Sequence, residues 1–361
     1  MESLKEYLDN LFKNEAIAPS TLKSRIAFLL SIAKTIPGKH TDLSFLSKQK
    51  AVMARVLDSE NHGTRFNRLV FIIAAIDSLS ENILTKRTND YYRSQLTKYE
   101  KLKQIRKDDN RMNQKQIDNF TELDNLQLSL ATKFNELFER YGITNRKVSR
   151  ADMDRLSKIG RNGYNLWRLG KDYQELMILA CYIFQPSLRD NFGHMKFASS
   201  VAKTKDTSKN YFRYARNWKD ATIHMSVYKN VKVLGTNVQI KCFKALLEVM
   251  KNWFDFLTLM LGEMPDYVFL YDFNISEKKT SWIDSKKELA QRVKRASLAV
   301  FEKDLTINSY RHIWEQYIHD HPDYKSNTIA ESEDIHNMLM HNYDTANRYV
   351  LIKDHPNGPK K

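Results

Sequence analysis

Apolar residues recur every three or four positions through the N-terminal part of the chain, and this spacing predicts amphipathic helices. In PSTLKSRIAFLLSIAKTIPG, Ser20 is the expected N-cap and Pro37-Gly38 ends the segment. One face of this helix carries Leu22, Ile26, Leu29, Leu30 and Ala33. Two later segments, DLSFLSKQKAVMARVL and TRFNRLVFIIAAIDSLSENIL, repeat the pattern with Leu43, Phe45, Ala51, Val56, Phe66, Val70, Ile73 and Ile76. A compact module of short helices is therefore predicted here.

A strongly charged stretch follows, NDYYRSQLTKYEKLKQIRKDDNRMNQKQ, which lacks a continuous apolar stripe and ends in polar residues. It is predicted to form a helix that runs into an interdomain linker, with the boundary near residues 110–118. A chain of 361 residues is long enough for two domains. We therefore expect a helical domain over residues 1–112 and a second domain over residues 113–361.

Alternation of apolar and polar residues, which is typical of half-buried strands, occurs between residues 195 and 243. MKFASS is one strand candidate, and ATIHMSVY and TNVQIKCF alternate clearly. Their apolar positions are Ile223, Met225, Val227, Val238, Ile240 and Cys242. Helical patterns surround this region, among them the strongly apolar QELMILACYIF and KALLEVMKNWFDFLTLML. The predicted fold class is mainly α with a small antiparallel β-sheet (α+β).

The formal net charge is +15, from 58 Lys and Arg against 43 Asp and Glu. This balance indicates a polyanionic partner, most simply nucleic acid, although a Lys-rich sequence can also reflect coding bias. The polar faces of the N-terminal helices carry Lys23, Arg25, Lys48, Lys50, Arg65 and Arg68. A solvated face explains any single one of them, but as a set they favour contacts with DNA phosphates.

The other compositional signals exclude several classes of protein. Cys181 and Cys242 are too few and too isolated for a disulfide framework or a cysteine-based zinc site. The opening MESLKEYLDN does not resemble a signal peptide. The longest apolar runs, LVFIIAAI and LMILACYIF, are shorter than the ~20 residues that span a bilayer. We expect an intracellular protein of a reducing compartment, neither secreted nor bound to a membrane.

Ready-made catalytic signatures are absent from the sequence. It contains no GxxxxGK[ST], GxGxxG, GxSxG or HExxH motif. The run HDH at residues 319–321 has metal-ligating residue types, but it precedes Pro322 in an expected loop and has no second ligand pair nearby. A polar loop is the preferred interpretation, and we expect no metal and no small-molecule cofactor.

Five widely spaced polar residues remain as candidates for chemistry. Arg189 follows the apolar helix, Lys229 lies in the turn of YKNVKVLG, and Arg311 lies near the start of a helix. His341 and Tyr349 lie close to the C-terminus. Each alone has an ordinary explanation, as an ion-pair partner, a solvated lysine or a packed tyrosine. Their order along the chain carries more information.

These residues resemble the motifs of the tyrosine recombinase (phage-integrase) family, most closely the branch encoded by eukaryotic viruses and mobile elements. Ser187-Leu188-Arg189-Asp190 is similar to the first motif of that branch, and Asn210-Tyr211 is similar to its strand motif. The stretch from Tyr228 to Gly235 is similar to its lysine-bearing turn. Asn308 to His312 stands at the second box, and Met340-His341 with Tyr349 at the last. The resemblance covers residues from about 15 to 352.

The resemblance implies a core-binding domain followed by a catalytic domain with a C-terminal nucleophile helix and tail. It implies that Tyr349 attacks a DNA phosphate and forms a phosphotyrosyl intermediate. Arg189 and Arg311 would clamp the nonbridging oxygens and His341 would donate a further hydrogen bond. Lys229 would protonate the leaving 5′ oxygen, with Lys232 as the fallback.

One residue departs from the family pattern. Asn308 stands where the family usually has a histidine base, and an amide cannot take a proton at neutral pH. His312 is an auxiliary candidate, but neighbouring residues on a helix point about 100° apart, so it points away from Arg311. Slow activity, proton transfer to water or to His312, and a drift towards binding alone remain open at this point.

The resemblance also implies partners and a location. The expected partner is double-stranded DNA, bound by a homotetramer with a dimer at each site. The expected location is DNA-associated, in the nucleus, the cytoplasm or a virus factory. Two alternatives to a recombinase or integrase are a type IB topoisomerase-like enzyme and a catalytically silent DNA-binding protein of the same fold. The separate helical module and the lysine turn favour the recombinase.

Overall fold

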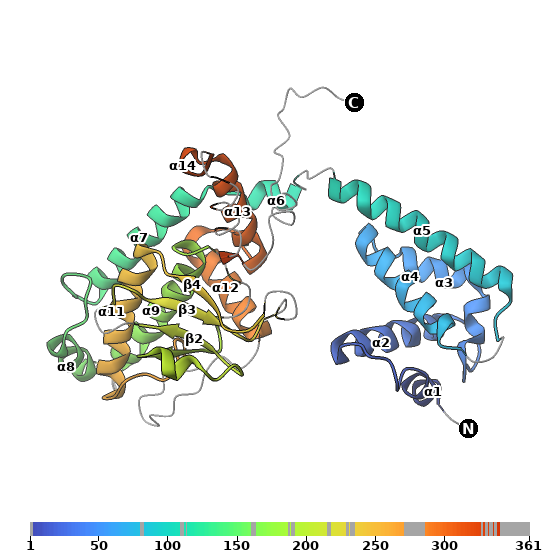
Figure 1. Cartoon of the computed structure of the whole chain (residues 1–361), viewed down its shortest axis with the longest axis horizontal. Coiled ribbons are helices and arrows are strands. Elements are labelled where there is room, and N and C mark those ends of the chain that lie inside the picture. The colour runs from blue at the N-terminus through green and yellow to red at the C-terminus, as the bar shows by residue number, and fades with distance from the viewer. Residues whose placement is uncertain are drawn as a thin grey trace. The chain divides into compact units, whose positions relative to one another are not determined.

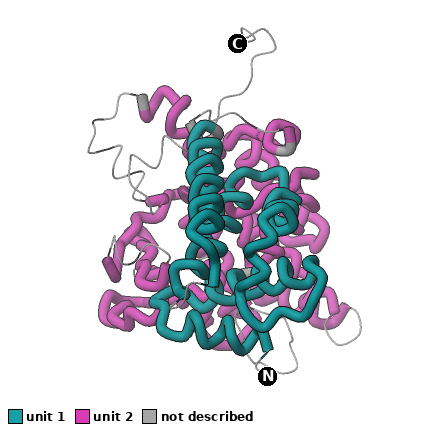
Figure 2. Tube along the Cα trace, turned by 90° about the vertical axis from the view of Figure 1, so that its right-hand side faces the viewer, with its two compact units in different colours: residues 1–110 teal, residues 111–361 magenta. Residues whose placement is uncertain are grey.

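The computed structural model divides the chain into two compact units, residues 1–110 and residues 111–361 (Figure 2). The described residues are 3–79, 83–108, 112, 114–159, 164–186, 188, 192–214, 218–228, 231, 235–270, 286–325, 328, 331, 335, 338 and 339. The division falls where the charged stretch ends. Each unit has a hydrophobic core of its own.

Unit 1 is helical in its described part, and local sequence explains where its helices begin. Its elements are α1 (Leu4–Leu11), α2 (Pro19–Thr35), the 3₁₀ turn η1 (Leu43–Ser47), α3 (Gln49–Leu57), α4 (His62–Asp77) and α5 (Lys86–Asp108). Ser3 and Glu6 form a capping box on α1, and Asn61 caps α4. α2 begins at Pro19, so Ser20 lies inside the first turn and is not the N-cap. Proline suits this position because the first helical N–H needs no intrahelical partner.

The core of unit 1 receives apolar side chains from each of these elements. Predicted core residues that are buried are Ile26, Leu29, Ala33, Leu43, Phe45, Val56, Ile73 and Ile76. Those that are only partly buried are Leu22, Leu30, Phe66 and Val70. Ala51 is exposed, and the fully buried residues of α4 are Leu69, Ile72 and Ala75. The Tyr92 hydroxyl of α5 donates a hydrogen bond of 2.6 Å to the Leu46 carbonyl, which ties α5 to η1.

Unit 2 surrounds a small sheet with helices (Figure 1). Its elements are α6 (Gln114–Asn119), α7 (Leu123–Arg140), α8 (Arg150–Lys158), α9 (Tyr164–Ile183), β1 (Met195–Ala198), η3 (Val201–Thr204), β2 (Asn210–Arg213), β3 (Thr222–Met225), β4 (Val238–Lys241), α11 (Lys244–Leu261), α12 (Lys286–Phe301), α13 (Ile307–Asp320) and α14 (Pro322–Lys325). α9 is the central helix, and every side chain from Leu176 to Ile183 is buried. α7, α8, α11, α12 and α13 all pack against it.

The sheet has the strand order β1-β2-β3-β4. β2 and β3 are antiparallel, as are β3 and β4, but β1 runs parallel to β2 with Met195 opposite Asn210. The sheet is therefore mixed, and the antiparallel prediction was wrong for its first strand. Parallel neighbours need a crossover connection, and the segment that contains η3 provides it. The fold class is confirmed as mainly helical α+β.

Both faces of β3 are buried, although its alternation predicted a half-buried strand. Ile223 and Met225 are buried on one face and His224 on the other. The register places Tyr211 of β2 and Gln239 of β4 on either side of His224, so large neighbouring side chains share the face on which His224 lies. A polar residue buried in such a place must find hydrogen-bond partners within the protein.

Candidate active site

Arg311 is the predicted catalytic residue that lies in the described part of the chain. Those outside the described residues are Arg189, Lys229, Lys232, His341 and Tyr349. Described residues flank three of these positions closely in sequence, namely Leu188, Tyr228 and Leu339. All three side chains belong to one hydrophobic core, which also receives α13.

The N-terminus of α13 is fixed by local sequence. Thr306 and Ser309 form a capping box, in which the Ser309 N–H donates to Thr306 Oγ1 over 3.2 Å and the Thr306 N–H donates to Ser309 Oγ over 3.1 Å. This motif satisfies two of the N–H groups that a helix start leaves without partners. The helix that carries Arg311 therefore begins at a defined residue.

Two aromatic side chains anchor α13 in the core of unit 2. Trp314 Nε1 donates a hydrogen bond of 2.9 Å to the Tyr182 carbonyl at the end of α9. The Tyr310 ring stacks on the Tyr182 ring with centroids 5.9 Å apart, and its hydroxyl lies 2.7 Å from Ser297 Oγ of α12. Burial raises the pKa of Tyr310, so its hydroxyl stays protonated. α13 is thus attached to both α9 and α12 by buried polar contacts.

Arg311 lies on the core-facing side of α13 with 1% of its surface exposed. Glu315, one turn further along the helix, is equally buried. A guanidinium held in the interior keeps its charge and has few conformations to choose from. Such a group is preorganised to meet a negatively charged ligand if the adjoining surface opens to one.

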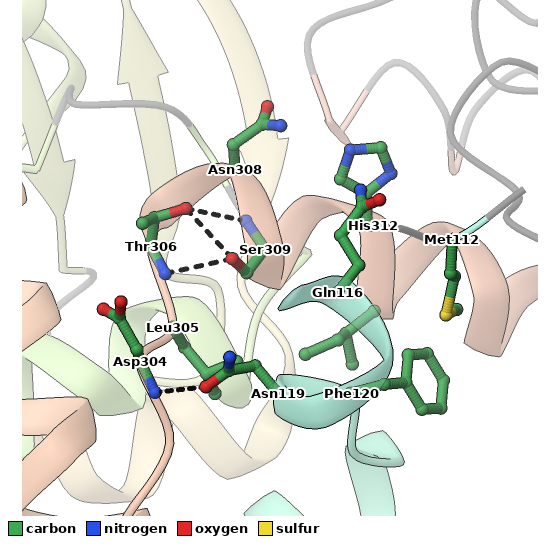
Figure 3. Close-up of a pocket in the computed structure, with 11 residues that line it drawn as sticks. Met112, Gln116, Asn119, Phe120, Asp304, Leu305, Thr306, Asn308, Ser309 and His312 are labelled. Carbon is green, nitrogen blue, oxygen red and sulfur yellow. Dashed lines mark hydrogen bonds between the residues drawn. The ribbon is translucent and has the colours of Figure 1, made fainter. Parts of the chain in front are cut away.

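Asn308 and His312 lie on a different side of α13, where they line a cavity of about 240 Å³ (Figure 3). Its polar lining also includes Gln116 and Asn119 from α6. The remaining lining residues are Met112, Phe120, Asp304, Leu305, Thr306, Ser309 and Ile313. The Asn119 side chain accepts a hydrogen bond of 2.6 Å from the Asp304 N–H, which joins the two walls of the cavity. The expectation that His312 and Arg311 point apart is confirmed, because one lines the cavity and the other is buried.

The end of α9, which precedes Arg189, is tied to the sheet by Gln185. The Gln185 amide donates a hydrogen bond of 3.1 Å to the Lys241 carbonyl and accepts one of 2.8 Å from the Phe243 N–H. It therefore holds the end of β4 beside the end of α9. Leu188 and Phe192 are buried in the same core. The two hydrogen bonds of Gln185 were not predicted from the sequence, because an isolated glutamine gives no periodic signal.

Polar side chains form a hydrogen-bonded network where the β3–β4 connection begins and ends, and we call this network the base of the connection. Lys229 belongs to the connection in sequence. Asn210 Oδ1 accepts hydrogen bonds of 2.9 and 2.8 Å from the N–H groups of Ser226 and Val227, and its Nδ2 donates 2.9 Å to the Val227 carbonyl. Ser226 Oγ accepts 3.0 Å from the Asn237 N–H on the returning side. Asn210 thus binds the end of β3 to β2.

Tyr228 links the beginning of the same connection to Gly235 on its returning side. Its buried hydroxyl donates a hydrogen bond to the carbonyl of Gly235, seven residues later. Gly235 has φ +81°, a left-handed conformation that favours glycine. Burial raises the pKa of Tyr228, so the hydroxyl remains a donor at neutral pH. We call these two residues the Tyr228–Gly235 clamp.

His224 supports this base from the middle of the sheet. One ring nitrogen lies 2.9 Å from Thr222 Oγ1 and the other lies 3.1 Å from Asn237 Oδ1. Burial lowers the pKa of His224, and the Arg213 charge lowers it further, against the opposing effect of the Asn237 hydrogen bond. The neutral imidazole therefore links β3 to Asn237, two residues after the clamp.

The predicted DNA contacts of unit 1 fall into two groups. Lys23, Lys48 and Lys50 are exposed. Lys48 and Lys50 border a shallow hollow at the start of α3, which Gln49, Ala51 and Ala54 complete. Exposed ammonium groups beside small side chains leave room for a phosphate backbone.

The three arginines of that set have partners inside unit 1. Arg25 is 6% exposed, pairs with Glu15 and lies 4.9 Å over the Phe12 ring. Arg68 donates hydrogen bonds of 2.9 Å to the Arg55 carbonyl and of 2.8 Å to the Asp58 carboxylate. Arg65 donates a hydrogen bond of 3.3 Å to the Leu57 carbonyl. Arg65 and Arg68 thus satisfy carbonyls at the end of α3. These contacts explain all three without a DNA partner.

Within the described residues, no group of three or more His, Cys, Asp or Glu side chains is arranged to hold a metal ion. In the HDH run, His319 Nδ1 lies 2.8 Å from Asp320 Oδ1, and His321 is the C-cap of α13. The same part of the chain contains no helix with both the length and the apolar character needed to cross a membrane.

Comparisons with protein-family models, with curated proteins and with solved structures found no match for this chain. A functional assignment therefore depends on its own residues. The relevant ones are the buried Arg311 on α13 and the polar base of the β3–β4 connection.

Proposed function

We propose that this chain is a site-specific DNA recombinase or integrase that cleaves and rejoins DNA strands through a 3′-phosphotyrosyl intermediate at Tyr349. The observation that carries the proposal is the buried guanidinium of Arg311. It lies on a helix of the same core that receives Leu188, Tyr228 and Leu339. These are close sequence neighbours of Arg189, Lys229 and His341, so the order of the motifs is compatible with one site.

The proposed reaction has one bond-forming and one bond-breaking step. The Tyr349 oxygen attacks the phosphorus, and the bond to the 5′ oxygen breaks. Lys229, or Lys232 in its place, gives its proton to that oxygen. Arg189 and Arg311 donate paired hydrogen bonds to the nonbridging oxygens and His341 donates another, since negative charge gathers there in the transition state. Attack by a 5′ hydroxyl on the phosphotyrosine reverses these steps and rejoins the strand.

The proposed partner is double-stranded DNA, with a homotetramer that holds two sites and a dimer at each. The net charge of +15 and the exposed Lys23, Lys48 and Lys50 support binding to a polyanion. An intracellular, DNA-associated location follows from the same proposal.

Asn308 favours a second candidate function, that of a catalytically silent DNA-binding protein. An amide at this position cannot accept the proton of the attacking tyrosine. His312 lines the same cavity as Asn308, so it is a titratable side chain of α13 that faces the same space (Figure 3). If the chain is an enzyme, we expect His312 or water to take the proton, and we expect slow cleavage.

The test is a covalent-adduct assay with negatively supercoiled plasmid, quenched with SDS. Wild-type protein should become linked to DNA, whereas Tyr349→Phe should bind DNA with nearly unchanged affinity and form no adduct. An adduct that persists in Tyr349→Phe would refute the assignment of the nucleophile. Clear salt-sensitive binding without any adduct would mean either that the plasmid lacks a sequence that the enzyme requires or that the protein is a silent DNA-binding protein. Relaxation of the plasmid without preference for a site would favour a topoisomerase.

Two further variants separate the candidates. Arg311→Lys should abolish adduct formation, because a point charge cannot replace the planar fork of the guanidinium. Arg150→Lys on α8 is a surface control, since Arg150 is exposed. Asn308→His should raise the cleavage rate if loss of a base is the cause of slow activity, and an unchanged rate would remove Asn308 from the reaction.

A further inference from the structure

The first three turns of α9 carry a stripe of exposed and partly exposed side chains that the proposed reaction does not use. Helical spacing brings together on this stripe Tyr164, Trp167, Arg168, Lys171 and Glu175. The opposite side of the helix holds Leu166, Leu169 and Tyr173, which are buried. α9 becomes buried on all sides from Leu176 onwards, so the stripe ends there. We call it the α9 stripe.

Two aromatic rings begin the α9 stripe. The rings of Tyr164 and Trp167 stack with centroids 6.1 Å apart and an interplanar angle of 29°. Tyr164 is 51% exposed, whereas Trp167 packs partly against the core. The Lys171 ammonium lies 5.4 Å from the centre of the Trp167 ring. The stack therefore ends in an exposed tyrosine and is bordered by a cation.

Positive charge predominates around these rings. Arg168 and Lys171 belong to the stripe, and Arg140 pairs with Asp172 at its edge over 3.7 Å. At the other end Glu175 lies among Lys171, Arg292 and Arg295. Arg292 pairs with Glu288 over 3.0 Å. The stripe and its border thus hold five cations against three carboxylates, so a polyanion fits it better than a cationic or a neutral ligand.

We propose that the α9 stripe binds single-stranded DNA. An unpaired base would stack on Tyr164, while Arg168 and Lys171 contact the flanking phosphates. Aromatic rings bind unpaired bases of any sequence, because each base has a π face that a duplex keeps covered. The choice of DNA over RNA rests on the proposed function, in which strand exchange exposes unpaired DNA.

The α9 stripe is separate from the candidate active site. From Tyr164 to Tyr182, the residue that contacts α13, the helix rises about 27 Å. Substitution of Tyr164 should therefore leave the chemistry at the phosphate unchanged, and the two proposals can fail independently.

The experiment measures binding of a labelled fifteen-nucleotide oligo-dT and of a blunt duplex to the full chain by fluorescence anisotropy. Tyr164→Ala should weaken oligo-dT binding about fivefold or more, the range expected for loss of one stacked base. Tyr164→Phe keeps the ring and should bind as the wild type does. Leu128→Ala on α7 removes another exposed large apolar side chain and is the control. Duplex affinity should change less than twofold in all three variants.

A second variant tests the charges of the stripe. Lys171→Ala should make the dependence of log affinity on log salt shallower by about 0.7 for oligo-dT, as expected for one lost phosphate contact on a single strand. Lys251→Ala on α11, another exposed lysine, should leave the slope unchanged.

Three outcomes would overturn the inference. The first is that Tyr164→Ala and Leu128→Ala bind oligo-dT equally well. The second is that Tyr164→Ala loses as much affinity for the duplex as for oligo-dT. The third is that the wild type binds oligo-U more tightly than oligo-dT. The covalent-adduct assay is run on the same preparations. A wild type that binds oligo-dT through Tyr164 but forms no adduct would count against the proposed function and leave the proposal for the stripe intact. The reverse result would refute the stripe alone.

Discussion

The Tyr228–Gly235 clamp offers a direct test of whether the β3–β4 connection presents the general acid. Tyr228→Phe removes one hydroxyl and with it the hydrogen bond to the Gly235 carbonyl, while the buried ring remains. The network of Asn210, Ser226 and Asn237 at the base of the connection is untouched. The change therefore affects the closure of the connection that contains Lys229 and leaves the sheet in place.

The size of the effect follows from the bond that is lost. A hydrogen bond of this kind contributes about 0.5–1.5 kcal/mol. If the hydroxyl holds the connection closed, its loss lowers the ratio of closed to open forms between about twofold and twelvefold. Cleavage that needs the Lys229 proton should slow by up to that factor. The global stability of unit 2 should fall by no more than that free energy.

The assay compares two leaving groups. On ordinary DNA the 5′ oxygen must be protonated as it leaves, so Tyr228→Phe should cleave slowly. On DNA with sulfur in place of the bridging 5′ oxygen, the leaving thiolate is far less basic than an alkoxide, as thiols are far more acidic than alcohols. It needs no acid, so the variant should cleave at the wild-type rate. Adduct yield against time, after an SDS quench, gives both rates.

An equal loss on both substrates would refute the reasoning, because it would mean that the clamp acts on the whole site and not on proton delivery. Equal rates of variant and wild type on both substrates would show that the hydroxyl does not set the closed population. Tyr317→Phe is a suitable control, since Tyr317 is partly exposed on α13 and away from this connection.

Three further predictions concern other parts of the chain. Thr306→Ala removes the N-cap of α13 and should lower the unfolding free energy by about 1 kcal/mol. The melting temperature of unit 2 should then fall by about 2–4 °C, and an unchanged value would show that the cap does not stabilise the unit. Replacing Lys48 and Lys50 together by alanine should weaken duplex binding and make the salt slope shallower by about 2, and an unchanged slope would remove both from the interface. Because burial lowers the pKa of His224, the unfolded chain takes up its proton first as pH falls, so the unfolding free energy should decrease below about pH 6.5. His224→Gln should flatten that decrease, and the exposed His319→Gln should not.

Helical periodicity in the sequence predicted most of the core because burial depends on one face of each element. It was least accurate where a side chain is long. Arg25 was assigned to a polar face, yet on a helical projection it lies about 60° from Leu22, beside the buried Ile32. Its guanidinium reaches the partly exposed Glu15, ten residues earlier, and no local pattern indicates such a distant partner.

Alternation within the sequence identified β3 and β4 correctly but could not give the direction of β1. Strand direction depends on the connection between strands, and the segment with η3 has no pattern of its own. The polar base of the β3–β4 connection was equally hidden. Asn210 and Ser226 are sixteen residues apart and meet only through pairing of β2 with β3.

The candidate site was predicted from the order of motifs, and the structure adds the burial of Arg311 and the cavity beside Asn308. The stack of Tyr164 on Trp167 was missed, although a spacing of three residues and two nearby cations could have indicated it.

The two sides of α13 have different freedom to change over evolutionary time. Arg311 is enclosed by the core, so almost any replacement would disturb the packing around it. Asn308 borders a cavity, where substitutions meet space and not tightly packed neighbours (Figure 3). A lineage can therefore exchange the residue at position 308 in a single mutational step while it keeps the guanidinium in place. Loss or recovery of a proton acceptor there would act as a reversible adjustment of turnover, open to selection without prior repair of the fold.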